Sequence, residues 1–139
     1  MKPAHLLAIA LAAASTGGTA AALTLTVEIT DARSTQGSLN AALYGSDTTW
    51  LDVASAVQVQ KVAVAPEKTV LVFSNLAPGR YALSGYHDEN GNGKLDTNVL
   101  GMPTERYGFT GSGGMMGPPS FDKAAVDVQA DTTVRVTLR

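Results

Sequence analysis

Residues 87–96 read HDENGNGKLD and place short oxygen-bearing side chains at alternate positions 88, 90 and 92 and again at 96. This spacing is typical of a loop that wraps around a hard cation, with ligands at positions 1, 3, 5, 7 and 9 and a glycine at the sharp turn. Oxygen ligands in a flexible loop suit Ca²⁺ better than Mg²⁺, which requires a rigid octahedron and keeps its waters. The predicted ligands are Asp88, Asn90, Asn92, the carbonyl of Lys94 and Asp96, with Gly93 at the turn.

The predicted calcium loop lacks its usual last ligand. Position 12 is Val99, where such loops place a bidentate glutamate. Glu105 is the next carboxylate along the chain, and Gly101 and Pro103 could turn the backbone toward the ion. Because only two aspartates and Glu105 supply charge, we expect a Kd of roughly 10⁻⁴–10⁻³ M, as in extracellular modules.

Other interpretations of the same residues stay open. Asn, Asp and Gly also build turns without metal, because their side chains bond to nearby backbone amides. A metal-free loop could form one wall of a carbohydrate or small-ligand cleft, lined by Trp50, Tyr86, Tyr107 and Phe109. A hydrolase using His87 is the least favoured function, since no nucleophile or second catalytic partner is recognisable. A copper site from His87, Met102, Met115 and Met116 has no supporting spacing.

The elements that must position this loop are strands. Apolar residues alternate with polar ones from residue 23 onward, a period of two that predicts half-buried β-strands rather than amphipathic helices. Short strands with turn signals between them predict an all-β fold, an antiparallel β-sandwich of about seven strands, with a small barrel as the alternative. We expect strands near residues 23–30, 39–43, 57–64, 69–73, 80–86, 124–128 and 133–138, and a long loop over residues 88–120.

The first 22 residues read as a secretory signal, with Lys2, an apolar run over residues 6–14 and small residues ending at Ala22. We therefore expect one domain over residues 23–139, located in the periplasm or secreted, with no membrane insertion after cleavage. The chain has no cysteine and a formal net charge of −2. Disulfides and thiolate sites are excluded, and nucleic acid is an unsuitable partner because no basic cluster occurs.

Several linked motifs carry a family resemblance. They are NLAPGRYA at 75–82, HDENGNGKLD at 87–96, GMPTE at 101–105 followed by YGF at 107–109, and PPSFDKA at 118–124. Together they resemble the bacterial domain-of-unknown-function family numbered 2141. The resemblance implies an exported protein with an immunoglobulin-like or transthyretin-like sandwich and no established activity. Glu105 falls in the family's Pro-x-Glu motif, and the 75–81 turn is similar to that of prealbumin-like and Cna-B-like surface modules.

The sequence therefore predicts an exported, non-enzymatic β-sandwich that binds Ca²⁺ in its long loop. The ordered loop would present Tyr107, Phe109 or the Met115–Met116 tip to a protein or glycan partner, whose identity the sequence does not reveal.

Overall fold

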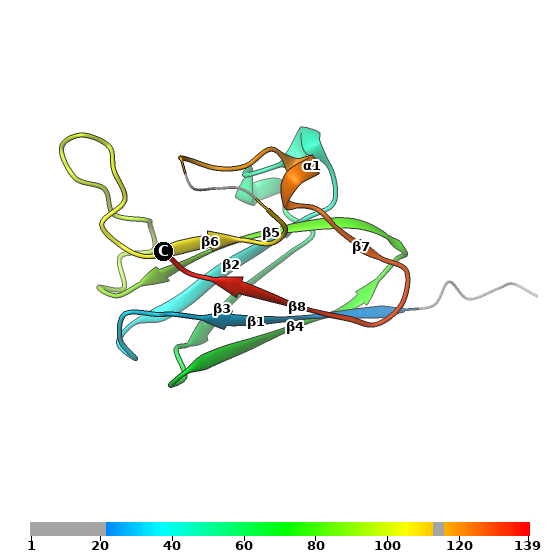
Figure 1. Cartoon of the computed structure of the whole chain (residues 1–139), viewed down its shortest axis with the longest axis horizontal. Coiled ribbons are helices and arrows are strands. Elements are labelled where there is room, and N and C mark those ends of the chain that lie inside the picture. Colours follow the sequence, from blue (N-terminus) through cyan, green and yellow to red (C-terminus); the bar gives the residue numbers. More distant parts are fainter. Residues whose placement is uncertain (1–21, 113–115) are drawn as a thin grey trace, which may run out of the picture.

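The computed structural model describes residues 22–112 and 116–139, in which eight strands form two facing sheets (Figure 1). The strands are β1 (Leu23–Thr30), β2 (Ser38–Tyr44), β3 (Gln58–Ala63), β4 (Lys68–Leu76), β5 (Gly79–Asp88), β6 (Tyr107–Phe109), β7 (Val126–Val128) and β8 (Thr132–Thr137). Three short helices complete the described part: the 3₁₀ turns η1 (Asp47–Thr49) and η2 (Val53–Ser55), and α1 (Phe121–Ala124).

One sheet has three strands in the order β4-β1-β8, with β1 antiparallel to β4 and parallel to β8. The other has five strands. In it β5 pairs with β2, and β3 lies beyond β2. Strand β5 also pairs with β7 near its beginning, at residues 79–81, and with β6 farther along, at residues 84–86. Strand β5 is thus the central strand of the five-stranded sheet, and its last residue, Asp88, opens the predicted cation loop.

The core lies between the two sheets because each strand turns one alternating face inward. In β1, Leu25, Val27 and Ile29 are buried, while the threonines and Glu28 between them face outward. Each fully buried aliphatic side chain contributes about 1.5–3 kcal/mol relative to exposure. The same alternation in β2, β4, β5 and β8 adds Leu39, Leu43, Leu71, Phe73, Leu83 and Val136 to this core.

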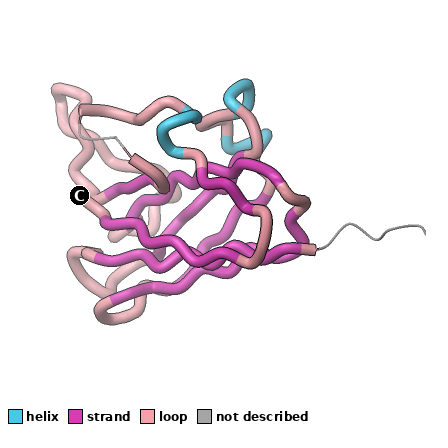
Figure 2. Tube along the Cα trace, turned by 45° about the vertical axis from the view of Figure 1, so that its right-hand side comes forward, coloured by secondary structure: helices cyan, strands magenta, loops and turns pink. Residues whose placement is uncertain are grey.

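A second apolar cluster covers part of the outer face of the five-stranded sheet. Tyr44 and Ala82 point outward there and are buried in one cluster with Phe121 and Ala124 of α1, and Trp50 packs against this cluster. The helical segments lie together beside the strands (Figure 2). The Trp50 ring meets the Tyr44 ring edge-on at 5.2 Å between centroids. Burial, the largest cause, raises the pKa of the Tyr44 hydroxyl, and the nearby Asp52 carboxylate raises it further.

The β-sandwich predicted from the sequence is confirmed, with eight strands in the described residues where about seven were expected. The pairing of β1 with β4 is irregular between Leu23 and Leu25. One prediction needs correction. The predicted 88–120 loop is interrupted by β6, which pairs with β5 on one side and exchanges backbone hydrogen bonds with Arg139 on the other.

The predicted signal peptide lies outside the described residues, apart from Ala22. Of the helices in residues 22–112 and 116–139, none is long and apolar enough to cross a membrane.

Candidate cation site

Asp88 is delivered to the site by the end of β5. It pairs with Ser38 of β2, and the chain just before β2 passes directly against it. Gly37 makes this approach possible: its φ is +70°, and a Cβ there would collide with the Asp88 carbonyl and the Glu89 backbone. Only glycine accepts both the positive φ and the close contact. The packing of two backbones therefore fixes the position of Asp88.

The Asp88 side chain is fully buried, at 0% exposure, yet only one of its carboxylate oxygens is satisfied. Oδ2 accepts the Gly93 backbone N–H at 2.8 Å and faces the Asn40 side-chain amide at 3.5 Å. Among residues 22–112 and 116–139, Oδ1 has no hydrogen-bond partner. Among the ion pairs of the described residues, none involves Asp88 or Asp96. A buried carboxylate thus keeps a free oxygen and lacks a positive partner.

The loop after Asp88 folds by a series of short turns. Gly91 and Gly93 have φ of +72° and +78°, so Gly93 makes the sharp turn that the spacing predicts. The Asn90 Oδ1 accepts the Asn92 backbone N–H at 3.2 Å, and the Asn92 Oδ1 accepts the Lys94 N–H at 3.1 Å. Since an amide oxygen has two lone pairs, each keeps one free for another contact.

The side chains of Asn90 and Asn92 converge on Asp96. Each amide nitrogen donates to a different oxygen of the Asp96 carboxylate. The four predicted side-chain ligands, Asp88, Asn90, Asn92 and Asp96, therefore belong to one hydrogen-bonded loop closed on itself through Gly93. In this arrangement the two side-chain amides donate to Asp96, while Asp88 Oδ1 has no partner among the described residues.

Glu105 joins the two ends of the loop by hydrogen bonds. It is 7% exposed, and its two oxygens accept the backbone N–H of Glu89 at 2.7 Å and that of Asp96 at 3.0 Å. These two groups stand at the beginning and end of the turn series. Thr104 adds a backbone hydrogen bond to the Asp96 carbonyl at 2.8 Å. Glu105 is thus placed as a residue that positions the loop, through both carboxylate oxygens.

His87 lies on the opposite face of β5 from Asp88. It is paired with the core residue Leu39 and is 0% exposed. Its Nε2 donates to the Gln36 carbonyl at 2.6 Å, because a carbonyl can only accept, and its Nδ1 lies 3.7 Å from the Glu89 carboxylate. Because the ring is enclosed, it does not meet solvent or a substrate where it lies.

Three of the aromatic residues proposed for a cleft wall are linked by ring contacts, since the Trp50 ring lies 6.0 Å from the Phe109 ring between centroids. Trp50 belongs to the second apolar cluster, and its Nε1 donates to the Pro119 carbonyl at 2.8 Å. The Tyr86 hydroxyl oxygen accepts a hydrogen bond from the Asn40 side-chain N–H at 3.0 Å. Tyr107 and Phe109 meet edge-on on β6, with ring centroids 5.8 Å apart. For the copper alternative, Met115 lies outside the described residues, while Met102 and Met116 are exposed and His87 is buried.

Within the described part of the chain, no three His, Cys, Asp or Glu side chains gather to hold a metal. The candidate site depends instead on two aspartates joined by amide and carbonyl oxygens. The sequence did not predict the contacts that Gly37, just before β2, and Asn40, in β2, make with Asp88. The one sequence signal is that Asn40 is a polar residue between Leu39 and Ala41 at an outward position of a strand.

Comparison with protein families identifies a match over most of the chain. Residues 27–136, from β1 to β8 and including the whole candidate site, match a family described as an uncharacterized protein conserved in bacteria, DUF2141. No curated protein and no solved structure matches the chain significantly. The family resemblance seen in the motifs is confirmed, whereas the looser similarity to prealbumin-like and Cna-B-like modules stays a prediction. The chain belongs to the DUF2141 family of bacterial proteins.

Proposed function

We propose that this protein is an exported, non-enzymatic binding module whose 88–105 loop is ordered by a calcium ion. The observation that carries the proposal is the free Oδ1 of Asp88, a buried carboxylate oxygen at the first position of a spaced series of oxygen ligands.

Energetics favour a cation at this point. Burying a carboxylate without full compensation is costly, and a buried charge is normally paired or bound to a metal. Among the described residues, the Gly93 N–H, at 2.8 Å, is the one donor closer to the Asp88 carboxylate than the Asn40 amide, at 3.5 Å. A calcium ion adjacent to Oδ1 would supply the missing partner, and the Asn90 and Asn92 oxygens keep lone pairs for it. The Lys94 carbonyl is the further proposed ligand at position 7.

Asp96 and Glu105 take different parts in this proposal. Position 9 of such loops often reaches the ion through a water, so Asp96 can serve without leaving its place in the loop. Glu105 does not need to move to the ion, because its hydrogen bonds to Glu89 and Asp96 already hold both ends of the loop. We therefore assign Asp96 as a direct or water-mediated ligand and Glu105 as a positioning residue.

The loop presents apolar side chains to solvent. Val99, Leu100 and Met102 are all exposed at its far end. Exposed apolar residues gathered on one loop are typical of an interaction surface. The proposed partner is a protein or a glycan, and calcium would act by holding Val99, Leu100 and Met102 in one conformation. The enclosed position of His87 supports a binding role rather than hydrolysis.

The test is a pair of thermal melts, one in about 10 mM calcium and one with chelator. With a Kd of roughly 10⁻⁴–10⁻³ M, mass action stabilises the native state by about 1–3 kcal/mol. The control is magnesium at the same concentration, which we expect to have a much smaller effect. Superimposed transitions with calcium and chelator would contradict the proposal.

Export has a separate test. Expressed in a bacterial host, the full chain should appear in the periplasm or medium with Leu23 or a residue one or two positions earlier as its first residue, because the signal pattern ends at Ala22. N-terminal sequencing reads this directly, and an uncleaved cytoplasmic product would contradict it.

A further inference from the structure

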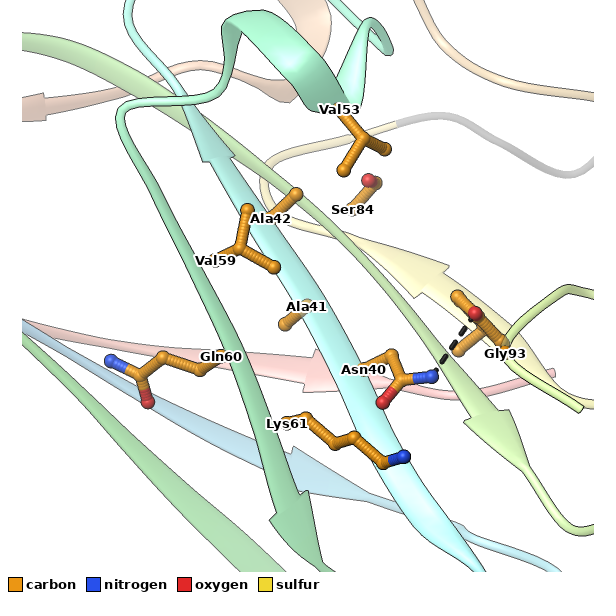
Figure 3. Close-up of a pocket in the computed structure, with 10 residues that line it drawn as sticks. Asn40, Ala41, Ala42, Val53, Val59, Gln60, Lys61, Ser84 and Gly93 are labelled. Atoms are coloured by element: carbon orange, nitrogen blue, oxygen red, sulfur yellow. Dashed lines mark hydrogen bonds between the residues drawn. The ribbon is translucent and has the colours of Figure 1, made fainter. Parts of the chain in front are cut away.

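Beside the candidate cation site, the outer face of the five-stranded sheet carries a cleft with a volume of about 350 Å³. Its floor and walls come from β2, β3 and β5, with Val53 of η2 at one end and Gly93 of the cation loop at the other (Figure 3). The second apolar cluster covers the neighbouring part of the same face, so the cleft is where this cover stops. Ligand sites of small molecules have volumes of about 300–1,000 Å³.

The residues of the cleft form two parallel rows across the strands. In the first row, Val59, Ala42 and Ser84 are cross-strand neighbours, and the small side chains of Ala42 and Ser84 leave the hollow. In the second row, two residues farther along each strand, Lys61, Asn40 and Tyr86 are cross-strand neighbours. Since a strand rises about 3.3 Å per residue, the rows are about 6–7 Å apart. One end of the cleft is thus mainly apolar and the other is polar.

The polar row offers hydrogen-bond donors and a positive charge. Lys61 has no ion-pair partner among the described residues, and no acidic side chain lines the cleft. The Tyr86 hydroxyl accepts the Asn40 amide at 3.0 Å, so its own hydrogen is left to donate. An ammonium and a hydroxyl beside an apolar hollow form a site that fits a carboxylate attached to an apolar group.

We propose that this cleft binds a small organic carboxylate, with its carboxylate between Lys61 and Tyr86 and its apolar portion over Ala42 and Val59. This inference goes beyond the calcium proposal and does not depend on it. The two sites are neighbours through Asn40, whose amide also faces Asp88 Oδ2 at 3.5 Å. A cation bound to Asp88 would reduce the negative potential beside the cleft, so calcium should tighten carboxylate binding.

The probe for the test is benzoate, with benzyl alcohol as its neutral match, titrated into ¹⁵N-labelled protein while the amide resonances are followed. Benzoate should shift the amides of Ala42, Lys61 and Ser84, and benzyl alcohol should bind roughly tenfold more weakly or not at all. Lys61→Gln should lose roughly tenfold in benzoate affinity, while Lys123→Gln on α1, also exposed, should lose none. Val59→Ser should weaken binding, and Val72→Ser on the other sheet should not; these valines are 57% and 49% exposed, so neither change disturbs the core.

Several results would overturn the cleft proposal. They are the absence of shifts with benzoate, equal affinity for benzyl alcohol, unchanged affinity in Lys61→Gln, or shifts that map away from the cleft. Repeating the titrations with calcium and with chelator separates the two proposals. Benzoate binding that is the same in both conditions supports the cleft and contradicts its coupling to a cation, whereas tighter binding in calcium supports both.

Discussion

Replacement of Asp88 by asparagine probes the buried orphan oxygen with almost no change of shape. In the native protein, Oδ2 accepts the Gly93 N–H, and Oδ1 has no partner within the part of the chain that the structure describes. An asparagine must turn its oxygen toward Gly93 to keep that hydrogen bond. Its NH₂ group then occupies the position of Oδ1 and presents hydrogens to any cation. The substitution therefore removes a charge and converts the proposed first ligand into a repulsive group.

The substitution should lower stability relative to the native protein in calcium but not in chelator. With chelator, Asp88→Asn removes an uncompensated buried charge, so the variant should be at least as stable as the native protein. With about 10 mM calcium, the native protein gains about 1–3 kcal/mol and the variant gains nothing. At about 4 °C per kcal/mol for a domain of this size, the native melting temperature should rise by about 4–12 °C.

The assay is differential scanning calorimetry of both proteins, with Asp127→Asn as the matched control. Asp127 is an exposed residue of β7 whose carboxylate, among the described residues, accepts a hydrogen bond from the Gln129 side chain alone, so this variant should keep the full response to calcium. An equal calcium-dependent rise in Asp88→Asn would refute the reasoning. So would a variant that is strongly destabilised in chelator, since Asp88 would then already be compensated within the protein.

Three further expectations follow from the structure. Gly37→Ala should lower the unfolding free energy, measured by urea denaturation, far more than Gly91→Ala does. Both glycines have φ near +70°, but Gly37 lies against another backbone, whereas Gly91 faces open space. Glu105→Gln should cost about 1–3 kcal/mol of unfolding free energy and weaken calcium binding, because one amide oxygen cannot accept both N–H groups that the carboxylate holds. Glu28→Gln should reduce the loss of unfolding free energy at acid pH. A hydrogen bond from Lys68 and the charge of Lys68, with a smaller effect of Arg135, lower the pKa of Glu28. The stability that ionised Glu28 contributes is therefore present above about pH 4.5 and is lost as pH falls through the lowered pKa.

Each of these has a result that contradicts it. Equal losses for the two glycine variants would mean that the contact of Gly37 with the Asp88 backbone is relieved at little cost. An unchanged unfolding free energy for Glu105→Gln, with Glu67→Gln as the exposed control, would remove the positioning role of Glu105. The same loss of unfolding free energy at acid pH in the native protein and in Glu28→Gln would show that the 2.9 Å ion pair between Glu28 and Lys68 does not cause the acid sensitivity.

The parts of the fold that the sequence predicts are those fixed by local pattern. The alternation from Leu23 to Thr30 specifies which face of β1 is buried, and the structure follows it residue by residue. The turn glycine at Gly93 is predictable for the same reason, since its φ is set by its immediate neighbours. Spacing alone also places Asn90, Asn92 and Asp96 in one loop, where their side chains do meet.

The parts that escape prediction depend on contacts between distant segments. Strand β6 has only three residues and no alternating signal, and it is defined by its hydrogen bonds to β5 and Arg139. Glu105 is a candidate ligand by sequence, but the structure satisfies both its oxygens with backbone N–H groups. The cleft arises because Ala42 and Ser84 are small at adjoining positions of two strands, which no single strand reveals.

The central claim is that a calcium ion binds at the free oxygen of Asp88, and a crystal structure grown in calcium tests it most directly. An anomalous difference map recorded from such crystals should contain one strong peak about 2.3–2.6 Å from Asp88 Oδ1, with the Asn90 and Asn92 oxygens in the same coordination sphere. A well-ordered loop with no peak beside Asp88, at calcium concentrations far above the expected Kd, would contradict the account.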